Sequence, residues 1–271
     1  FVVSAVASVS AGLLLRRLVS LDEDDETARG AVWFMYIFPT SYFLHIGYTE
    51  SLFLALALGA LLAARKGRWW AAGLLTALAG LTRVNGTLLV PALAVEAWGQ
   101  YRRERRWRAQ WLWIAAGVAG LLGYLWLNLY VTDDALTFMR IQREHWFKEP
   151  SAPWVGLAKV WEAAWARVPA EALMVGWQEL VFILLGFVST VWCALRLRAS
   201  YAVWMALNCL LWTSTSFILS VPRYTLILFP LFILFARLAR ARFFWRALLT
   251  LWSLMSLAFF VSLFAQGHWA F

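Results

Sequence analysis

The sequence predicts an all-α membrane protein, a polytopic bundle of transmembrane helices, from its composition and from the form of its apolar runs. Of 271 residues, 63% are hydrophobic and 14% are charged, and apolar runs recur about every 25 residues. The runs are continuous and rich in Leu and Ala, whereas strands of a membrane β-barrel alternate apolar and polar residues. We therefore expect one domain over residues 1–271, with about ten membrane segments, some of them short or re-entrant.

The first half of the chain predicts one span and two broken hairpins. Residues 1–15 form the span; because the chain begins inside an apolar run without Met, we expect it to be a piece of a longer protein. The acidic run 22–26 (DEDDE) predicts a solvated linker. Residues 31–64 would make a helix of about 50 Å, too long for a hydrocarbon core of about 30 Å, so they predict a hairpin. Residues 69–98 predict two short arms, which either sink into a protein-lined cavity or form a re-entrant pair.

The second half predicts five spans and one long outer loop. The first of these spans covers residues 110–131 and leads into the loop, residues 132–172. Apolar residues in the loop recur at helical spacing, which predicts an amphipathic helix lying on the outer membrane interface. These residues are Leu157, Trp161, Trp165 and Val168, with Trp154 nearby. The other four spans are expected near residues 174–195, 200–219, 224–237 and 247–265.

Basic residues predict the orientation of these segments, because Lys and Arg gather at the cytoplasmic ends of spans. Of the 24 basic residues, 17 fall in segments assigned to the cytoplasmic face and seven on the outer face. The seven are Arg83, Arg140, Arg143, Lys148, Lys159, Arg167 and Arg223. The net charge of +9 is therefore explained by orientation in a membrane, and we expect no nucleic-acid partner.

Five polar islands between the apolar runs are expected on the outer face, where together they would build one site. They are residues 38–53 (FPTSYFLHIGYTESLF), 82–86 (TRVNG), 138–146 (FMRIQREHW), 152–156 (APWVG) and 220–224 (SVPRY). Glu50 starts an apolar helix, and a carboxylate at the bilayer centre costs about 2.5 to 3.5 kcal/mol, so it must face protein or water. The alternative is that Glu50 and Thr49 cap this helix, whose dipole favours a carboxylate there.

Two outer-face arginines are candidate phosphate ligands. Arg83 and Arg223 lie beside a turn former and a helix breaker, Asn85 and Pro222. Planar guanidinium groups are suited to clamp a lipid-linked phosphate. Alternatively, each arginine snorkels to lipid headgroups at the interface. Tyr224 would stack on a sugar or anchor the chain at the interface.

No motif for a metal, a cofactor or a nucleotide is present. The sequence has no HExxH, no paired CxxC, no Walker-type glycine loop and no Rossmann fingerprint, which argues against a metalloprotease, a zinc site and a nucleotide-driven pump. We expect no metal and no cofactor. Cys193 and Cys209 fall in apolar runs as small buried residues, and His145 is expected to be structural or exposed and not a base.

Four stretches resemble the motifs of one enzyme family, in that family's usual order. They are residues 38–53, 79–93 (AGLTRVNGTLLVPAL), 136–154 (LTFMRIQREHWFKEPSAPW) and 220–236 (SVPRYTLILFPLFILFA). YTES followed about thirty residues later by TRxNG is the more specific part of the pattern, and the RY-x(5)-P pattern near the end is shared with related membrane transferases. The sequence thus resembles the glycosylphosphatidylinositol mannosyltransferase II (PIG-V type) family of the GT-C glycosyltransferase superfamily.

The resemblance implies a multi-pass enzyme that transfers mannose from a polyprenyl-phosphate donor to a lipid, glycan or protein acceptor on the non-cytoplasmic face, with inversion. It places the catalytic aspartate in a first outer loop upstream of residue 1; Asp133 and Asp134 are outer-face acids by position only. The donor phosphate would be bound by Arg83 and Arg223. The substrate-binding residues would be Tyr48, Glu50, Asn85, Gln142, Trp146 and Tyr224. The Arg-, Trp- and Ala-rich composition suggests a bacterial protein of the cytoplasmic membrane; a eukaryotic member would lie in the endoplasmic reticulum membrane.

Two other functions fit parts of the sequence. Broken hairpins with charged residues would also suit a transporter or lipid flippase, although no internal inverted repeat is found and the polar residues gather on one face. A noncatalytic scaffold subunit of a glycosylation complex would need no aspartate motif. An acidic motif in the upstream coding sequence would favour the enzyme over the scaffold.

A cysteine at Thr132 tests the predicted topology. Because residue 132 follows a span that leads outward, we expect an impermeant thiol reagent to label Thr132→Cys from the non-cytoplasmic side only. Labelling is measured in sealed right-side-out and inverted vesicles, with the unsubstituted chain as the control for Cys193 and Cys209. Labelling from the cytoplasmic side alone would overturn the topology and the site built on it.

Overall fold

The computed structural model describes residues 1–166 and 168–271 of the chain and consists of helices joined by turns. Over this described part there is no strand, and Pro150 and Thr215 make one isolated antiparallel bridge. The prediction of an all-helical protein is therefore confirmed. Arg167, which the sequence assigns to the outer face, lies outside the described residues.

The first half of the chain forms six α-helices and three 3-10 turns close to the predicted segments. The α-helices are α1 (Val2–Val19), α2 (Asp25–Ile37), α3 (Glu50–Arg65), α4 (Trp69–Thr82), α5 (Leu89–Glu104) and α6 (Ala116–Thr132). The 3-10 turns are η1 (Ser41–Leu44), η2 (Val84–Leu88) and η3 (Ala109–Ala115). The hairpin predicted for residues 31–64 is open, because α2 and α3 each pack on α1. The long link between them contains Pro39, which cannot continue α2.

The second half has two helices in the predicted outer loop and then the remaining apolar helices. The loop contains α7 (Thr137–Trp146) and α8 (Pro153–Ala164). They are followed by α9 (Pro169–Glu171), the π-helical turn η4 (Ala172–Trp177), α10 (Gln178–Arg196), α11 (Ala199–Thr213), α12 (Val221–Tyr224), the 3-10 turn η5 (Thr225–Ile227), α13 (Pro230–Ala241) and α14 (Phe243–Ala265).

Four described helical segments are long and apolar enough to cross a membrane. They are Val2–Val19, Ala109–Thr132, Pro169–Arg196 and Phe243–Ala265. Val221–Ile227 and Pro230–Ala241 meet the same criterion only as a pair, which would make a fifth span. These helices are typical of a membrane protein, and most residues of α6 and α14 lie on the molecular surface, as lipid-facing helices require. The shorter helices α2, α3, α4, α5 and α11 do not meet the criterion, so the larger number of about ten membrane segments stays a prediction.

Two predicted spans have the wrong boundaries. The span expected at residues 224–237 is broken, because η5 ends at Ile227 and α13 starts at Pro230, with an 83° bend between the two parts. A proline has no N–H for a preceding helix and is favoured at a helix start. The span expected at 200–219 ends at Thr213, because the residues that follow bond to the outer loop, where the Ser216 N–H donates to the Glu149 carbonyl at 2.8 Å.

The amphipathic helix expected in the outer loop is shorter than its apolar pattern. A helix does form, α8, but it ends at Ala164, so that Trp165 is its C-cap and Val168 lies beyond it. Val160 and Ala164 face inward, where Ala164 packs against Gly176, and Trp161 is exposed. The small residues therefore form the packed face of α8, and the tryptophans form its outer face.

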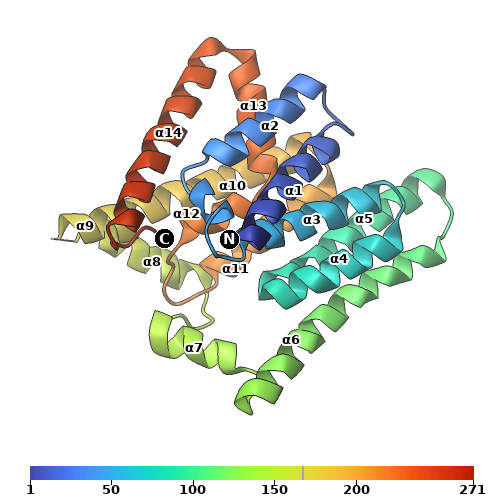
Figure 1. Ribbon diagram of the computed structural model, residues 1–271, viewed down its shortest axis with the longest axis horizontal. Coiled ribbons are helices and arrows are strands. Elements are labelled where there is room, and N and C mark those ends of the chain that lie inside the picture. The colour runs from blue at the N-terminus through green and yellow to red at the C-terminus, as the bar shows by residue number, and fades with distance from the viewer. Residues whose placement is uncertain (167) are drawn as a thin grey trace.

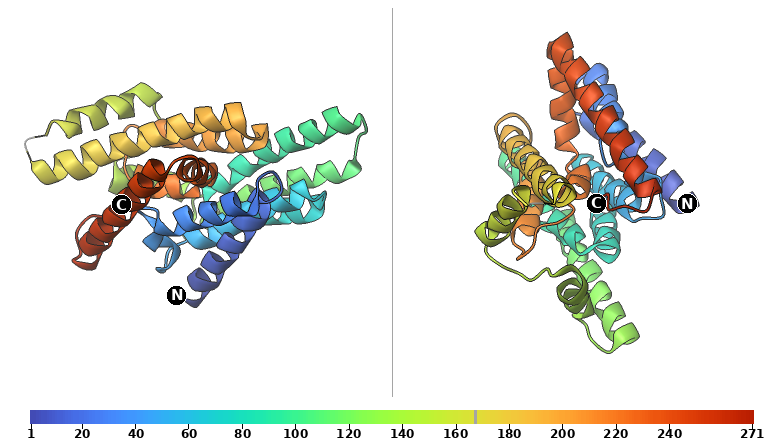
Figure 2. Two further views of the ribbon diagram at one scale, coloured as in Figure 1. Left: turned by 90° about the horizontal axis from the view of Figure 1, so that it is seen from above. Right: turned by 90° about the vertical axis from the view of Figure 1, so that its left-hand side faces the viewer.

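The helices form two groups, with α3 to α6 at one end of the molecule and α2, α13 and α14 at the other. Figure 1 shows α3, α4 and α5 side by side with α6 running below them, while α13 and α14 stand as an antiparallel pair at the other end beside α2. Both views of Figure 2 place α1 and α10 on opposite sides of the molecule. Helix α6 approaches α4 closely because Gly120 faces the backbone of Ala77, where any Cβ would collide. Small residues at helix contacts are typical of membrane bundles.

The acidic run 22–26 is largely exposed, as the sequence predicts, but it is more than a linker, because α2 begins at Asp25 and all five carboxylates pair with arginines. The pairs are Asp22 with Arg65 and Arg198, Glu23 with Arg237, Asp24 and Glu26 with Arg240, and Asp25 with Arg16 and Arg29. The Arg16 hydrogen bond holds the pKa of Asp25 below its usual value. A carboxyl group whose pKa is lower in the folded state than in the unfolded state stabilises the fold at pH values above its unfolded pKa. This contribution is lost as the pH falls through the folded pKa.

A further carboxylate, Glu96 of α5, lies at this charged end of the molecule. It is buried and accepts hydrogen bonds from Arg198 and Ser200, each at 2.9 Å, and from Gln100 at 3.3 Å. Arg198 is the N-cap of α11, and Ser200 lies in its first turn. Glu96 therefore fixes the start of α11 against α5.

Replacing Glu96 tests this connection. We expect Glu96→Gln to lower the free energy of unfolding by about 3 kcal/mol, because it leaves Arg198 in a largely buried place without its main partner. The matched control is Glu104→Gln on the same helix, whose exposed pair with Arg108 is worth less than about 1 kcal/mol. Unfolding is followed by denaturant titration in detergent micelles. Equal losses in the two variants would contradict a structural role for Glu96.

Candidate functional site

The centre of the candidate site is a buried carboxylate shared by two arginines. Glu50 is the first residue of α3 and is 1% exposed. Its Oε1 atom accepts a hydrogen bond from Nε of Arg223 at 2.5 Å and another from Nη1 of Arg83, and Nη2 of Arg223 lies 2.5 Å from the same oxygen as part of the ion pair. Because two guanidinium groups share one carboxylate, these three side chains carry one surplus positive charge. We call Glu50, Arg83 and Arg223 the arginine–glutamate cluster.

Arg83 is placed by the sharp end of α4. It is the C-cap residue, with an extended backbone that turns its side chain away from the helix axis toward α3. The turn η2 then folds back on α4 so closely that a Cβ at Gly86 would collide with the backbone of Ala79. Nη1 of Arg83 also lies 3.3 Å from the Thr49 hydroxyl. The TRVNG island therefore directs its arginine to the start of α3.

Arg223 is placed by a carboxylate from α10. Glu179 is fully buried and accepts the backbone N–H groups of Ser220 at 2.6 Å and Val221 at 2.8 Å. Ser220 has a left-handed backbone, and these two bonds hold the turn before α12. Arg223 is the third residue of α12. Glu179 is not among the residues that the sequence predicts for the site. The available signal was a lone acidic residue at the start of an apolar span, because such residues are rarely accidental.

Two aromatic rings from residues 38–53 also contact the Arg223 guanidinium. The guanidinium carbon lies 4.6 Å from the ring centre of Phe43 and 4.5 Å from that of Tyr48. The Thr40 hydroxyl donates to the Pro222 carbonyl at 2.9 Å, which binds residues 38–53 directly to residues 220–224. Stacking and ion pairing together fix the plane of this guanidinium.

The outer loop joins the same region through Lys148. Its Nζ atom donates to the Leu219 carbonyl at 2.9 Å and lies 3.2 Å from the Tyr224 hydroxyl. Gly156 packs against the Thr215 carbonyl and Ile218. Residues 38–53, 82–86 and 220–224 therefore meet at the cluster, and Gly156 packs on the residues that precede Ser220, whereas no described contact joins residues 138–146 to the other islands. From the sequence, Lys148 is used only to predict the orientation of the chain. Its position two residues after the island 138–146 is the signal that could have identified it as part of the site.

The substrate-binding residues that the sequence predicts are only partly brought together. Tyr48 lies in the cluster and is 43% exposed. Tyr224 is turned toward Lys148 and packs on Trp212, with 5.8 Å between the ring centres.

Three further predicted residues lie outside the cluster. Asn85 donates through Nδ2 to Oδ1 of Asn208 in α11 at 3.2 Å. Trp146 lies against Trp269, and Gln142 is exposed on α7. None of these three contacts the arginine–glutamate cluster within the described contacts. Asn85 thus connects η2 to α11, while α7 presents Gln142 and Trp146 at the surface.

The two outer-face aspartates serve the turn between α6 and α7. Asp133 is the C-cap of α6, with a left-handed backbone. The Asp134 carboxylate accepts the Leu136 N–H at 2.9 Å and lies 4.0 Å from Arg140. These contacts explain both residues locally, and neither contacts the cluster in the part of the chain described.

The structure also shows what holds Glu50 and the two arginines. Thr49 is the N-cap of α3, but its side chain makes no capping hydrogen bond. The Arg83 and Arg223 side chains are 19% and 18% exposed and are directed to Glu50, so the cluster is held by ion pairs instead of capping or snorkelling. The second oxygen of Glu50, Oε2, is buried and has no hydrogen-bond partner among the described residues. An unpaired buried carboxylate oxygen is costly, which makes it a strong potential acceptor.

Known proteins add no assignment to this site. No family model, no curated protein and no solved structure matches the chain. Across residues 1–166 and 168–271, no group of three or more His, Cys, Asp or Glu side chains is placed to hold a metal ion. The interpretation of the cluster therefore rests on its geometry and on the sequence motifs.

Removing the shared carboxylate tests the charge balance of the cluster. We expect Glu50→Gln to lower the free energy of unfolding by about 3 to 5 kcal/mol, because two largely buried guanidinium groups then face each other without a carboxylate. The double variant Glu50→Gln/Arg83→Gln should recover part of this loss, because one cation is removed with the anion. Denaturant titration of both variants in micelles measures the difference. If the double variant is no more stable than Glu50→Gln, charge repulsion is not the cause.

Proposed function

We propose that the protein is a membrane glycosyltransferase of the GT-C type, similar to the glycosylphosphatidylinositol mannosyltransferase II family. It transfers mannose from a polyprenyl-phosphate donor to a lipid, glycan or protein acceptor on the non-cytoplasmic face, with inversion. The GT-C architecture, about ten membrane segments and a location in the bacterial cytoplasmic membrane, or in the endoplasmic reticulum membrane of a eukaryote, belong to this proposal. The observation that carries it is the arginine–glutamate cluster, in which two arginines share one buried carboxylate.

The donor phosphate would bind to the unused side of the two guanidinium groups. Arg83 contacts Glu50 and Thr49 through Nη1, and Arg223 contacts Glu50 through Nε and Nη2. A guanidinium group has five N–H donors, so each arginine keeps donors for a second anion. The surplus positive charge of the cluster favours such an anion. Negative charge grows on the phosphate as the sugar leaves, and fixed cations stabilise that charge most in the transition state.

Glu50 and Tyr48 would orient the sugar. Glu50 would orient the sugar through the two arginines that its Oε1 atom holds, because its Oε2 atom is buried and out of reach of a ligand. The Tyr48 ring lies beside Arg223 and is partly exposed, so one face of the sugar would pack on it. Gln142 and Trp146 on α7 and Tyr224 beside Lys148 would form the acceptor side.

The proposed reaction is a single displacement. A carboxylate removes the proton from the acceptor hydroxyl, whose oxygen attacks the anomeric carbon of mannose while the bond to the phosphate oxygen breaks. The carboxylates at the site already have other partners: Glu50 binds two arginines, and Glu179 binds two backbone N–H groups. We therefore assign neither of these two carboxylates as the base; the resemblance implies an aspartate in that role.

Sugar transfer by membranes that contain the full-length protein tests this function. Labelled polyprenyl-phosphate mannose is compared with labelled nucleotide mannose. We expect incorporation from the lipid donor only, and a loss of about 100-fold in Arg83→Ala and Arg223→Ala, because each removes a phosphate donor. The matched control is Arg143→Ala, an exposed outer-face arginine that pairs with Glu149.

The outcomes separate the alternatives. Unchanged transfer in Arg83→Ala and Arg223→Ala would overturn the phosphate clamp. Arg83→Lys and Arg223→Lys keep the positive charge and serve as variants that are more readily folded. No transfer from either donor by a protein shown to be folded would favour a transporter, a flippase or a scaffold subunit.

A further inference from the structure

A large pocket lies between α2 and the α13–α14 pair and shares no residue with the arginine–glutamate cluster. Its volume is about 680 Å³, within the range of small-molecule sites. Its walls come from residues 26–34 of α2, the second half of α13 and the first half of α14. The pocket is therefore a separate structural feature, and what it binds does not depend on the proposed transferase activity.

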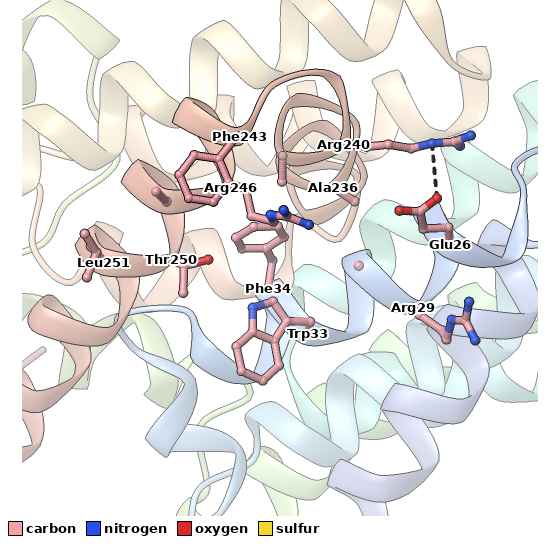
Figure 3. Close-up of a pocket in the computed structure, with 13 residues that line it drawn as sticks. Glu26, Arg29, Trp33, Phe34, Ala236, Arg240, Phe243, Arg246, Thr250 and Leu251 are labelled. Atoms are coloured by element: carbon pink, nitrogen blue, oxygen red, sulfur yellow. Dashed lines mark ion pairs between the residues drawn. The ribbon is translucent and has the colours of Figure 1, made fainter.

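The pocket has a charged side and an apolar side. Figure 3 shows Glu26, Arg29 and Arg240 gathered on one side, with Thr250 and Leu251 on the other. Trp33 and Leu251 are each more than half exposed, so the apolar side opens to the surroundings of the helices. An amphipathic ligand fits such an arrangement, with its polar end among the charges and its apolar end along the exposed wall.

Arg246 is the cation in the pocket that carries uncompensated charge. Arg240 pairs with Glu26 at 3.4 Å, and Arg29 pairs with Asp25 at 3.4 Å. Arg246 has no carboxylate within ion-pair distance in the described structure, and its guanidinium lies 5.6 Å from the ring centre of Phe243. Its guanidinium points into the middle of the pocket, between the charged and apolar sides (Figure 3). An anionic group at this position would neutralise it.

The hollow exists because small residues face each other at its base. A Cβ on Gly30 would lie 3.0 Å from the Cβ of Ala236, so α2 and α13 are in close contact there. Ala239 and Ala247 also line the space. A larger side chain at either alanine would occupy the pocket volume itself.

The position along α14 identifies the class of ligand. Helix α14 is apolar enough to span a membrane, and Arg246 lies in its first turn, beside the turn that the basic residues assign to the cytoplasmic face. A basic pocket between helices at that level matches the phosphate of a lipid headgroup, and the exposed apolar wall continues in the direction of the acyl chains. We propose that this pocket binds one anionic phospholipid, with its phosphate on Arg246 and an acyl chain along Trp33 and Leu251.

Lipid retention by the purified full chain tests the proposal. The protein is reconstituted in vesicles of phosphatidylcholine with one fifth phosphatidylglycerol, re-extracted in mild detergent, and analysed by native mass spectrometry. We expect one phosphatidylglycerol molecule to be retained preferentially, and Arg246→Gln to reduce this retention at least about fivefold. The matched control is Arg242→Gln, which removes the same charge from the same turn but does not line the pocket. Equal retention by the unsubstituted chain and Arg246→Gln, or an equal loss in Arg242→Gln, would overturn the site.

A variant that keeps every charge gives an independent test. Ala247→Trp fills the pocket without removing an arginine, and we expect it to lose the bound lipid as well. Brominated phosphatidylglycerol should quench the fluorescence of the unsubstituted chain more than that of Trp33→Phe, because Trp33 lines the acyl side. Full retention in Ala247→Trp would overturn the proposal. So would displacement of the lipid by millimolar inorganic phosphate, since the pocket would then bind the phosphate alone.

Discussion

The end of the molecule at which α3, α4 and α12 meet depends on one buried carboxylate. Glu50 contacts Arg83 and Arg223, which lie 33 and 173 residues away along the chain, so a single side chain connects the ends of α3, α4 and α12. Burying three charges costs several kcal/mol for each ion, and the arrangement is tolerated because the carboxylate is shared and Arg223 also stacks on two rings. A residue that only capped α3 would not connect distant segments in this way. The same contacts leave one positive charge without a partner, which is the property that any function of this region has to use.

The opposite end of the molecule uses charge in a different manner. There the acidic run and the arginines at the helix ends neutralise one another in a network of ion pairs, and Glu96 anchors the start of α11 from within. Many of these pairs are exposed, and exposed pairs contribute little individually. Their number, and the burial of Glu96 and Arg65, make this end a connected layer that determines where the helices begin and end.

Local patterns in the sequence predicted the elements and the polar islands well, and tertiary charge pairing poorly. Apolar runs and their breaks place nearly every helix, because helix length and hydrophobicity are local properties. Glu50, Arg83 and Arg223 were identifiable because a charge beside an apolar run needs an explanation. That one oxygen of Glu50 serves both arginines, and that Glu179 holds the turn before Arg223, depends on how helices pack, and no spacing in the chain encodes it. The ion pairs of the acidic run are not encoded by spacing for the same reason, since all of its arginine partners except Arg29 lie on other elements.

The ion pairs of the acidic run also impose an order on assembly. Glu23 and Arg237 are 214 residues apart, so at ribosomal rates of 5 to 20 residues per second the carboxylate is made roughly 10 to 40 s before its partner. When Glu23 is made, Arg16 has already been synthesised, and Arg65 follows within seconds. The partners on the first helices are therefore available to the acidic run while α13 is still absent, and the α13 arginines are the last of its partners to be made.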